Sequence, residues 1–245
     1  MLDNDGNLRL KKIMSNQIAE PANSNKLSDL VWEFNFRPDH YIHDSWLEQM
    51  PDGPLIKKLV GCHRGADRIV QYLMQRLGLE GQVFFNFSNS LARIGLWSGQ
   101  DLERLIMYTG AVFYHSKVQK VVARDEVLHI REQMDDELFN FMQSRSVQLK
   151  GKMDLSLKLP TGLDAEKSIR LAGLLCFHAA LGNYPVALRK RLMLKLPHEW
   201  FLLFKRAGAL GKPLSQKQSE CAALLQKIAI EVRMGIGSDG QIHFS

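Results

Sequence analysis

Cysteine is scarce in this 245-residue sequence: the three that it contains, Cys62, Cys176 and Cys221, are widely spaced and odd in number. Such a set does not fit a disulfide framework, so we expect reduced thiols inside a cell. A long apolar run is also missing, because the most apolar stretch, 171–181, is much shorter than the about 20 residues that cross a membrane. The polar first 25 residues lack the apolar core of a signal peptide. These absences predict a soluble, cytosolic protein.

The motifs of common enzyme classes are absent as well. The sequence contains no Walker phosphate loop, no glycine-rich dinucleotide fingerprint after a strand and no Gly-x-Ser-x-Gly nucleophile elbow. Cys62 and His63 are adjacent, but the side chains of sequence neighbours rarely face each other as a nucleophile and its base must. The acidic run 135–137 fits the solvated side of a helix. We therefore predict a protein that is not an enzyme and needs no cofactor.

One cluster has the residue types of a metal site: Asp39, His40, His43 and Asp44. His40 and His43 would share one face of a helix, but zinc needs further ligands, and the sequence has neither a Cys-x-x-Cys nor a His-Glu-x-x-His pair. We interpret the histidines as surface or half-buried residues and predict no metal. A hydrolase that uses them is an alternative, which a loss of activity in His43→Ala would reveal.

What the sequence does contain is a dense aromatic segment, 31–51, with two tryptophans, two phenylalanines, a tyrosine and two histidines. Residues 32–36 alternate large apolar and polar side chains, which predicts an extended arm. Pro38 suits the first position of a helix, on which Ile42 and Trp46 would share a face. The aromatic side chains either fill a core or form a recognition patch, since Trp, Tyr and Arg dominate binding hot spots.

Apolar spacings of three and four predict helices for most of the remaining chain. They run over 66–77, 91–97, 98–113, 117–144 (or a kinked continuation of the helix before it), 169–181, 185–192, 197–207 and 215–232. The helix at 169–181 is apolar nearly all round and should be central to the core. Residues 211–213 are interpreted as a linker, and Ser215 with Gln218 as a capping box.

Residues 149–159 break the helical pattern. Leucine or methionine alternates there with polar residues, which is typical of a half-buried strand. Its partner would be 241–244, 83–87 or a strand of another protein. The predicted fold class is therefore mainly α: an irregular multi-helix globular domain with at most a small β-hairpin or short strands.

Three regions follow from composition along the chain. Residues 1–27 are rich in Asn, Ser, Lys and Asp and are predicted to form a disordered or loosely attached N-terminus. Residues 28–235 are predicted to form a single helical domain. Residues 236–245 are expected to be a loose tail or a short strand.

The net charge of +6 is unevenly distributed. Between Pro185 and Lys217 the sequence has one acid, Glu199, and eight basic residues: Arg189, Lys190, Arg191, Lys195, Lys205, Arg206, Lys212 and Lys217. Such a region can bind nucleic acid, anionic lipid or an acidic protein, or simply form solvated helix faces. A helical nucleic-acid-binding regulator is therefore an alternative function, which steeply salt-dependent DNA binding would reveal.

A resemblance to a known family rests on Trp32-x-Phe34-Asn35-x-Arg37-Pro38-Asp39-x-Tyr41-Ile42-His43-x-Ser45-Trp46-Leu47. This segment resembles the N-terminal segment of the SctK/YscK family, cytosolic accessory proteins of the bacterial type III secretion sorting platform. The order of helices after it is also similar, so the resemblance covers roughly residues 28–235. It implies an adaptor without catalytic activity, peripheral to the inner-membrane apparatus. Such an adaptor joins an SctD-like inner-membrane ring protein to an SctQ-like pod protein, with an SctL-like stator as a further candidate partner.

A scaffold of this kind needs two separate surfaces. As hypotheses, one lies in the aromatic segment and the other in the basic region. The candidate interface residues are Trp32, Phe34, Arg37, Tyr41, His43 and Trp46 in the first, and Arg189, Lys190, Arg191, Lys205 and Arg206 in the second.

Overall fold

The computed structural model describes residues 22–60, 65–121, 124–153 and 155–234, and over these residues the chain is helical and contains no strand. The predicted mainly α fold class is confirmed. The elements are α2 (Ala22–Phe36), η1 (Pro38–His40), α3 (Asp44–Glu48), α4 (Gly53–Leu59), α5 (Ala66–Arg76), α6 (Ser90–Arg93), η2 (Ile94–Leu96), α7 (Gly99–Val118), α8 (Arg124–Glu132), α9 (Asp136–Lys150), α10 (Ala165–Ala180), α11 (Val186–Leu194), α12 (His198–Ala207), η3 (Gly208–Gly211), α13 (Lys212–Ser215) and α14 (Gln218–Met234).

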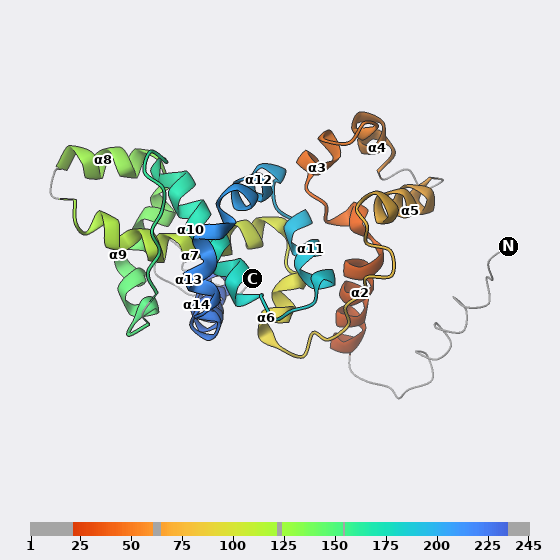
Figure 1. Cartoon of the computed structure of the whole chain (residues 1–245). Helices are drawn as coiled ribbons and strands as arrows, with labels where there is room; N and C mark the ends of the chain where they lie inside the picture. The colour runs from red at the N-terminus through yellow and green to blue at the C-terminus, as the bar shows by residue number, and fades with distance from the viewer. Residues whose placement is uncertain (1–21, 61–64, 122–123, 154, 235–245) are drawn as a thin grey trace.

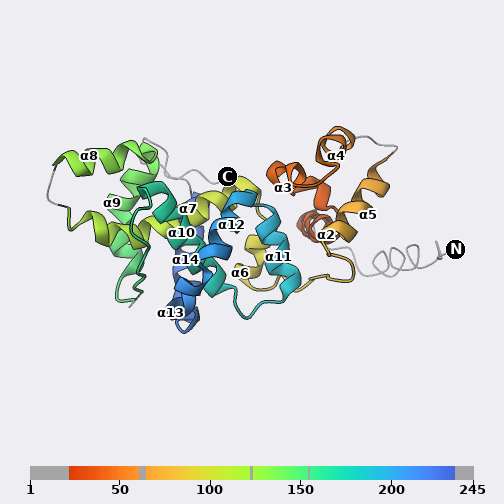
Figure 2. The same ribbon diagram turned by 45° about the horizontal axis from the view of Figure 1, so that its top comes forward.

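The N-terminal helices α2 to α5 lie at one end of an elongated molecule, and α8 with α9 lies at the other (Figures 1 and 2). The N-terminal helices have a small apolar core of their own. Leu194 of α11 completes this core, whose other buried members are Ile42, Leu47, Ile56, Leu73 and Leu79. The N-terminal end is thus attached to the rest of the chain through α11 and through the packing of α2 on η2.

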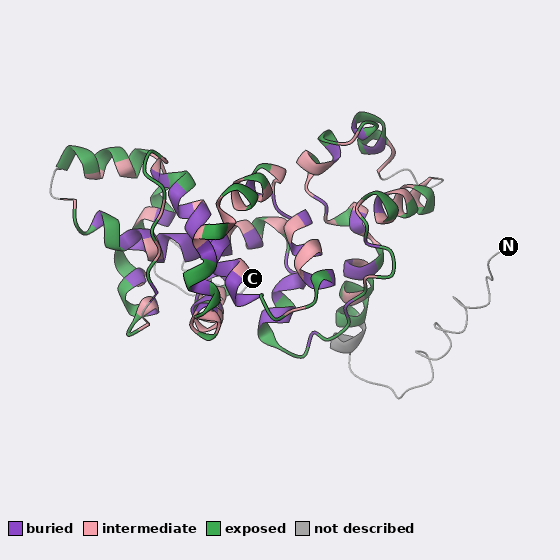
Figure 3. Cartoon of the chain, in the orientation of Figure 1, coloured by how far each residue is buried: buried purple, intermediate pink, exposed green. Residues whose placement is uncertain are grey.

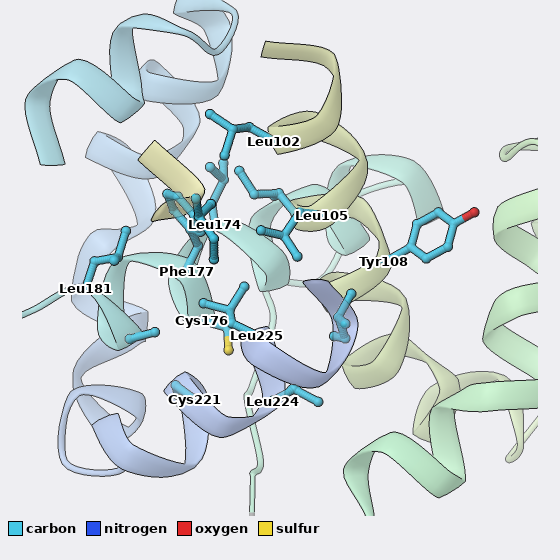
Figure 4. Close-up of a cluster of buried hydrophobic side chains, with 14 of the residues drawn as sticks. Leu102, Leu105, Tyr108, Leu174, Cys176, Phe177, Leu181, Cys221, Leu224 and Leu225 are labelled. Carbon is cyan, nitrogen blue, oxygen red and sulfur yellow. The ribbon is translucent and has the colours of Figure 1, made fainter. Parts of the chain in front are cut away.

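The main core forms around α7 and α10, with α9, α12 and α14 packed against them. Figure 4 shows side chains of α7, α10 and α14 converging on this core, among them Leu105, Leu174 and Leu225, which are almost completely buried. The predicted central position of the 169–181 helix is confirmed. Figure 3 shows the opposite case in α8, which has no buried residue.

Local signals in the sequence account for several helix starts. The side chain of Ser98 accepts a hydrogen bond from the backbone N–H of Asp101 at the start of α7, as expected for an N-cap. Asp164 does the same for Lys167 at the start of α10. Pro185 and Pro197 directly precede α11 and α12. The predicted helices at 66–77 and 91–97 are also present, as α5 and as α6 with η2.

The predicted extended arm at 32–36 is wrong, because these residues are the last turn and a half of α2. Trp32 and Phe36 are four residues apart, and their rings meet at 6.0 Å on the outer side of the helix, whereas Phe34 points into the core. An alternation over only five residues fits the two-residue period of a strand and the 3.6-residue period of a helix equally well. The predicted helix after Pro38 is also wrong, since Pro38–His40 is one 3₁₀ turn and α3 begins only at Asp44.

The predicted helix at 117–144 is wrong as a single element. The helix α7 continues to Val118, and the acidic run 135–137 divides the remainder into α8 and α9. Asp135 is the N-cap of α9, because its side chain accepts a hydrogen bond from the N–H of Leu138. Asp135 thus starts a helix, and Asp136 and Glu137 are exposed in its first turn, as the sequence predicted for a solvated acidic run.

The predicted strand at 149–159 is wrong. The helix α9 continues to Lys150 and ends at Gly151, whose φ is +52°. Residues 155–159 have no strand assignment, although Leu155 is buried and Lys158 exposed. The period of two thus reflects alternate burial, and the described residues contain no strand that pairs with this segment.

The predicted linker at 211–213 and the capping box at Ser215 are also wrong. Residues 212–215 form α13, and the hydroxyl of Ser215 donates to the carbonyl of Gly211 within that turn. Residues 1–21, 61–64 and 235–245 lie outside the described residues, and with them Cys62, His63 and the candidate strand 241–244. The helix α2 begins at Ala22, inside the region assigned to the N-terminus. No helix among the described residues combines the length and the apolar character needed to cross a membrane.

Two glycines allow α7 and α10 to touch backbone to backbone. A Cβ atom on Gly173 would lie 2.0 Å from the carbonyl oxygen of Ile106, and one on Gly110 would lie 1.8 Å from that of Ile169. We expect Gly173→Ala to lower the free energy of unfolding by about 2–3 kcal/mol, because the main helix pair would have to separate. Urea denaturation measures this. Gly208→Ala is the matched control, since its nearest neighbour would be 3.9 Å away, and equal losses in both variants would contradict the prediction.

Candidate functional site

A buried cation on α11, Arg191, contacts the C-terminal end of α2. Arg191 is fully buried, and its Nε and Nη2 donate to the carbonyl oxygens of Phe34 and Asn35, each at 3.0 Å. These two carbonyls lie in the last turn of α2, where a helix leaves acceptors unpaired. A positive charge there also favours the negative end of the helix dipole. Burial lowers the pKa of Arg191.

Lys195, which directly follows α11, has the same role at η2. Its ammonium group donates to the carbonyl oxygens of Gly95 (2.8 Å) and Trp97 (2.7 Å). It also lies 5.7 Å from the ring centre of Phe34 and 5.2 Å from that of Tyr41, within the range of cation–π attraction. Burial lowers the pKa of Lys195 to about 8.

Lys190 completes the set at α5. Its ammonium group donates to the carbonyl of Gly78 at 3.0 Å, and Gly78, with a φ of +56°, ends the turn after that helix. Three cations from one short segment thus bind carbonyls at the ends of α2, α5 and η2. We call Lys190, Arg191 and Lys195 the capping cations.

A second seam joins α3 to the corner between α11 and α12. The indole N–H of Trp46 donates to the carbonyl of Leu196 at 2.8 Å, and the hydroxyl of Ser45 accepts from the N–H of His198 at 2.8 Å. The backbone N–H of His43 donates to the carbonyl of Leu194 at 2.9 Å. Trp46 is thus used inside the molecule, with one edge of its ring against His198.

The candidate interface residues therefore divide into two groups. Phe34 and Arg191 are buried, Tyr41, His43, Trp46, Arg189 and Lys190 are half-buried, and Arg37 forms a two-pronged ion pair with Asp39. Burial raises the pKa of the Tyr41 phenol. Trp32, with 53% of its surface exposed, and Lys205 and Arg206 in the last turn of α12 remain exposed. These three side chains are free to meet a partner.

The candidate metal cluster is dispersed into local contacts. Nδ1 of His40 lies 2.8 Å from a carboxylate oxygen of Glu33, Nδ1 of His43 caps α3 at Ser45, and Asp39 pairs with Arg37. Over the described ranges, no three His, Cys, Asp or Glu side chains are grouped so that they could hold a metal ion.

A charged hollow of about 410 Å³ lies between α7, α9, α10 and α12. Its two arginines are both paired: Arg104 contacts Glu137, and Arg170 contacts Glu166 and Glu199. Burial raises the pKa of Glu103 in its wall. The hollow holds paired charges beside the rings of Tyr108 and Trp200, and no Ser, Thr, Cys, Lys or His side chain is among its lining residues.

The sequence analysis missed several residues that organise this region. Asn35 is fully buried, and its amide binds both backbone groups of Phe84. Lys195 was counted only as part of the basic region. A single asparagine between aromatic residues, and a basic run without acids at its side, are the signals that could have indicated internal hydrogen bonds. Phe36 and Phe85, which are exposed, gave no signal beyond their apolar character.

Comparisons with known proteins identify a family and a similar fold. A family model described as "YOP proteins translocation protein K (YscK)" matches residues 30–235 of this chain. No curated protein matches the chain. A solved structure, that of the cytoplasmic domain of the T3SS sorting platform protein PscK from P. aeruginosa, is similar, with a TM-score of 0.52 and 21% sequence identity. The match covers 82% of this chain and 94% of that one, and at this identity it demonstrates a shared fold.

The buried Arg191 gives the second prediction. We expect Arg191→Met to lower the free energy of unfolding by about 3 kcal/mol, because the carbonyls of Phe34 and Asn35 would lose charged donors and remain buried. Urea denaturation followed by circular dichroism measures this. Arg206→Met, at an exposed position, should change stability by less than about 0.5 kcal/mol. Equal effects in the two variants would show that the buried hydrogen bonds contribute little.

The lowered pKa of Lys195 predicts that the stability of the fold depends on pH. An unfolded lysine titrates near its ordinary value of 10.5, but Lys195 in the folded chain titrates at about 8. Between these values the unfolded state binds more protons, so this group makes stability rise with pH. We expect the free energy of unfolding of the wild type, measured relative to that of Lys195→Met, to rise by about 1–2 kcal/mol from pH 8 to 9.5. A difference that is constant over this range would refute the expectation.

Proposed function

Because the chain belongs to the YscK family, we propose that it is a component of the sorting platform of a bacterial type III secretion system. The observation that carries the proposal is the extent of the family match, which spans residues 30–235. The fold supports it, because the match to the PscK domain covers 94% of that domain.

Within the platform, the proposed role is that of a non-catalytic adaptor. It would link an SctD-like inner-membrane ring protein to an SctQ-like pod protein, with an SctL-like stator as a further candidate partner. The proposed location is the cytoplasm, beside the inner-membrane apparatus. The site chemistry fits this role, since His43 caps α3 and His40 contacts Glu33, and the arginines of the charged hollow are paired with carboxylates.

An adaptor needs two surfaces, and two exposed sets of side chains support them. The first, the aromatic surface, consists of Trp32 and Phe36 on the outer side of α2. Contiguous exposed apolar side chains can mark an interaction site, and tryptophan is enriched in binding hot spots. The second, the basic surface, consists of Lys205 and Arg206 at the end of α12. The two surfaces are on different helices that α11 connects.

The nucleic-acid alternative loses support from the same geometry. It requires the basic region 185–217 to present its charges to phosphates. The capping cations Lys190, Arg191 and Lys195 instead donate to backbone carbonyls of this chain, and Arg191 and Lys195 do so in its interior. Three of the eight basic residues that the sequence offers in this region are therefore used within the chain.

Co-purification with the SctD-like and SctQ-like proteins encoded beside its gene tests the proposal. We expect Trp32→Ala to weaken capture of one partner and the double change Lys205→Glu with Arg206→Glu to weaken capture of the other, each by about tenfold or more. Each variant should leave the second partner bound.

Lys158→Glu is the matched control, because Lys158 is exposed and lies on neither surface. Wild-type protein that captures neither partner would overturn the proposed function. Capture of both partners that is unchanged in all variants would overturn the assignment of the two surfaces.

A further inference from the structure

The segment 82–88, which joins α5 to α6, contains a short extended stretch whose backbone groups are hydrogen-bonded on one side only. The side-chain amide of Asn35 donates to the carbonyl of Phe84 and accepts from its N–H, both at 2.8 Å. The N–H and the C=O of one residue point in the same direction only when its backbone is extended. Asn35 thus acts toward Phe84 as a neighbouring strand would.

The opposite side of this stretch is open. Successive residues of an extended chain turn their backbone groups to alternate sides, so those of Val83 and Phe85 point away from α2. The carbonyl of Phe85 accepts from Phe87 at 3.1 Å. The other three groups, the N–H and C=O of Val83 and the N–H of Phe85, have no protein partner within the part of the chain that the structure describes. The side chains of Val83 and Phe85 are also exposed, at 42% and 60%.

A groove of about 690 Å³ runs along this stretch. It is lined by Val83, Phe84, Phe85, Asn86, Ser88, Asn89, Tyr184 and Pro185. Figures 1 and 2 show the segment running between α2 and the turn that leads into α11. One wall is therefore the open backbone edge, and the other is the start of α11.

The charges around the groove indicate which kind of segment would bind there. None of the lining residues is acidic, and α11 begins at the wall without an acid in its first turn and without a side-chain cap. The same helix carries Arg189, Lys190 and Arg191 and no acid. An acidic group next to this helix start would be favoured by the dipole and by Arg189, the basic residue of α11 that is not a capping cation.

We propose that an extended segment of a platform partner, apolar along its length and acidic at one end, adds as a β-strand to the edge formed by Val83 and Phe85. Backbone hydrogen bonds supply the pairing in this mode of recognition, and pockets for alternate side chains supply specificity. The acidic end lies against the start of α11. This inference rests on the proposed function, because it takes the partner from the platform.

The test measures binding of the purified SctD-like and SctQ-like proteins to the full chain by calorimetry. Phe85→Pro removes the N–H of Phe85, and Phe85→Ala removes only the ring. We expect Phe85→Pro to bind one of the two partners about tenfold more weakly than Phe85→Ala does, with unchanged circular dichroism. Equal binding by the two variants would overturn the proposal.

Hydrogen exchange tests the same proposal on the wild-type complex, so the result does not depend on whether a variant folds. The backbone amides of Val83 and Phe85 should exchange at least about tenfold more slowly in the complex than in the free protein. Unchanged exchange at both amides would overturn the proposal even if the partner binds.

The charge part is tested at Val186, which is 56% exposed at the start of α11. Val186→Glu should weaken binding of the same partner about tenfold by repulsion, whereas Val186→Gln should not. An acid at this position favours the helix itself, so a purely structural effect would not reduce binding. Equal binding by both variants would overturn the acidic occupant. If the wild type binds neither protein, the proposed function fails, and this inference fails with it.

Discussion

Hydrogen bonds from the capping cations to helix-end carbonyls are the constraint on which the arrangement of this protein depends. Buried cations are usually neutralised by carboxylates, but Arg191 and Lys195 are instead surrounded by carbonyl dipoles and aromatic rings. Removing such charges from water is costly, and the depressed pKa of both groups reflects that cost. Each charged hydrogen bond offsets part of it with about 1.5–3 kcal/mol. The cations also pair carbonyls that helix ends would otherwise leave buried and unpaired.

This constraint divides the positive charge of the chain into a structural part and a part available to partners. In the region 185–217, Lys190, Arg191 and Lys195 hold other helices, whereas Lys205 and Arg206 are exposed. The two parts are adjacent in sequence and identical in chemical type. A surface-charge argument from sequence therefore overestimates the basic patch, and the proposed partner surface on α12 is correspondingly small.

The elements that the sequence predicts well are those whose signals are local. Ser98 and Asp164 start their helices because a side chain binds a backbone N–H three residues later, and that contact depends on a few neighbouring residues. The errors arise where the conformation depends on contacts between residues that are far apart in the sequence. Residues 32–36 fit both a strand and a helix, and much of the packing around Phe34 comes from residues 53 and 157 positions away, Phe87 and Arg191. Likewise, nothing near Arg191 in sequence indicates that its acceptors lie 156 and 157 residues earlier.

The same long-range contacts bear on how an adaptor can work. The aromatic surface lies on α2, whose last turn Arg191 holds, and the basic surface lies on α12, which begins three residues after Lys195. Trp46 further ties α3 to the corner between α11 and α12. A pull on one surface is therefore transmitted through buried hydrogen bonds and aromatic packing, and not through a loose linker. For a protein that is proposed to join a membrane ring to a cytoplasmic pod, such coupling keeps the two partners at a defined distance and orientation. The helix α11, which the sequence presented as a binding face, acts as the internal connection between the two faces.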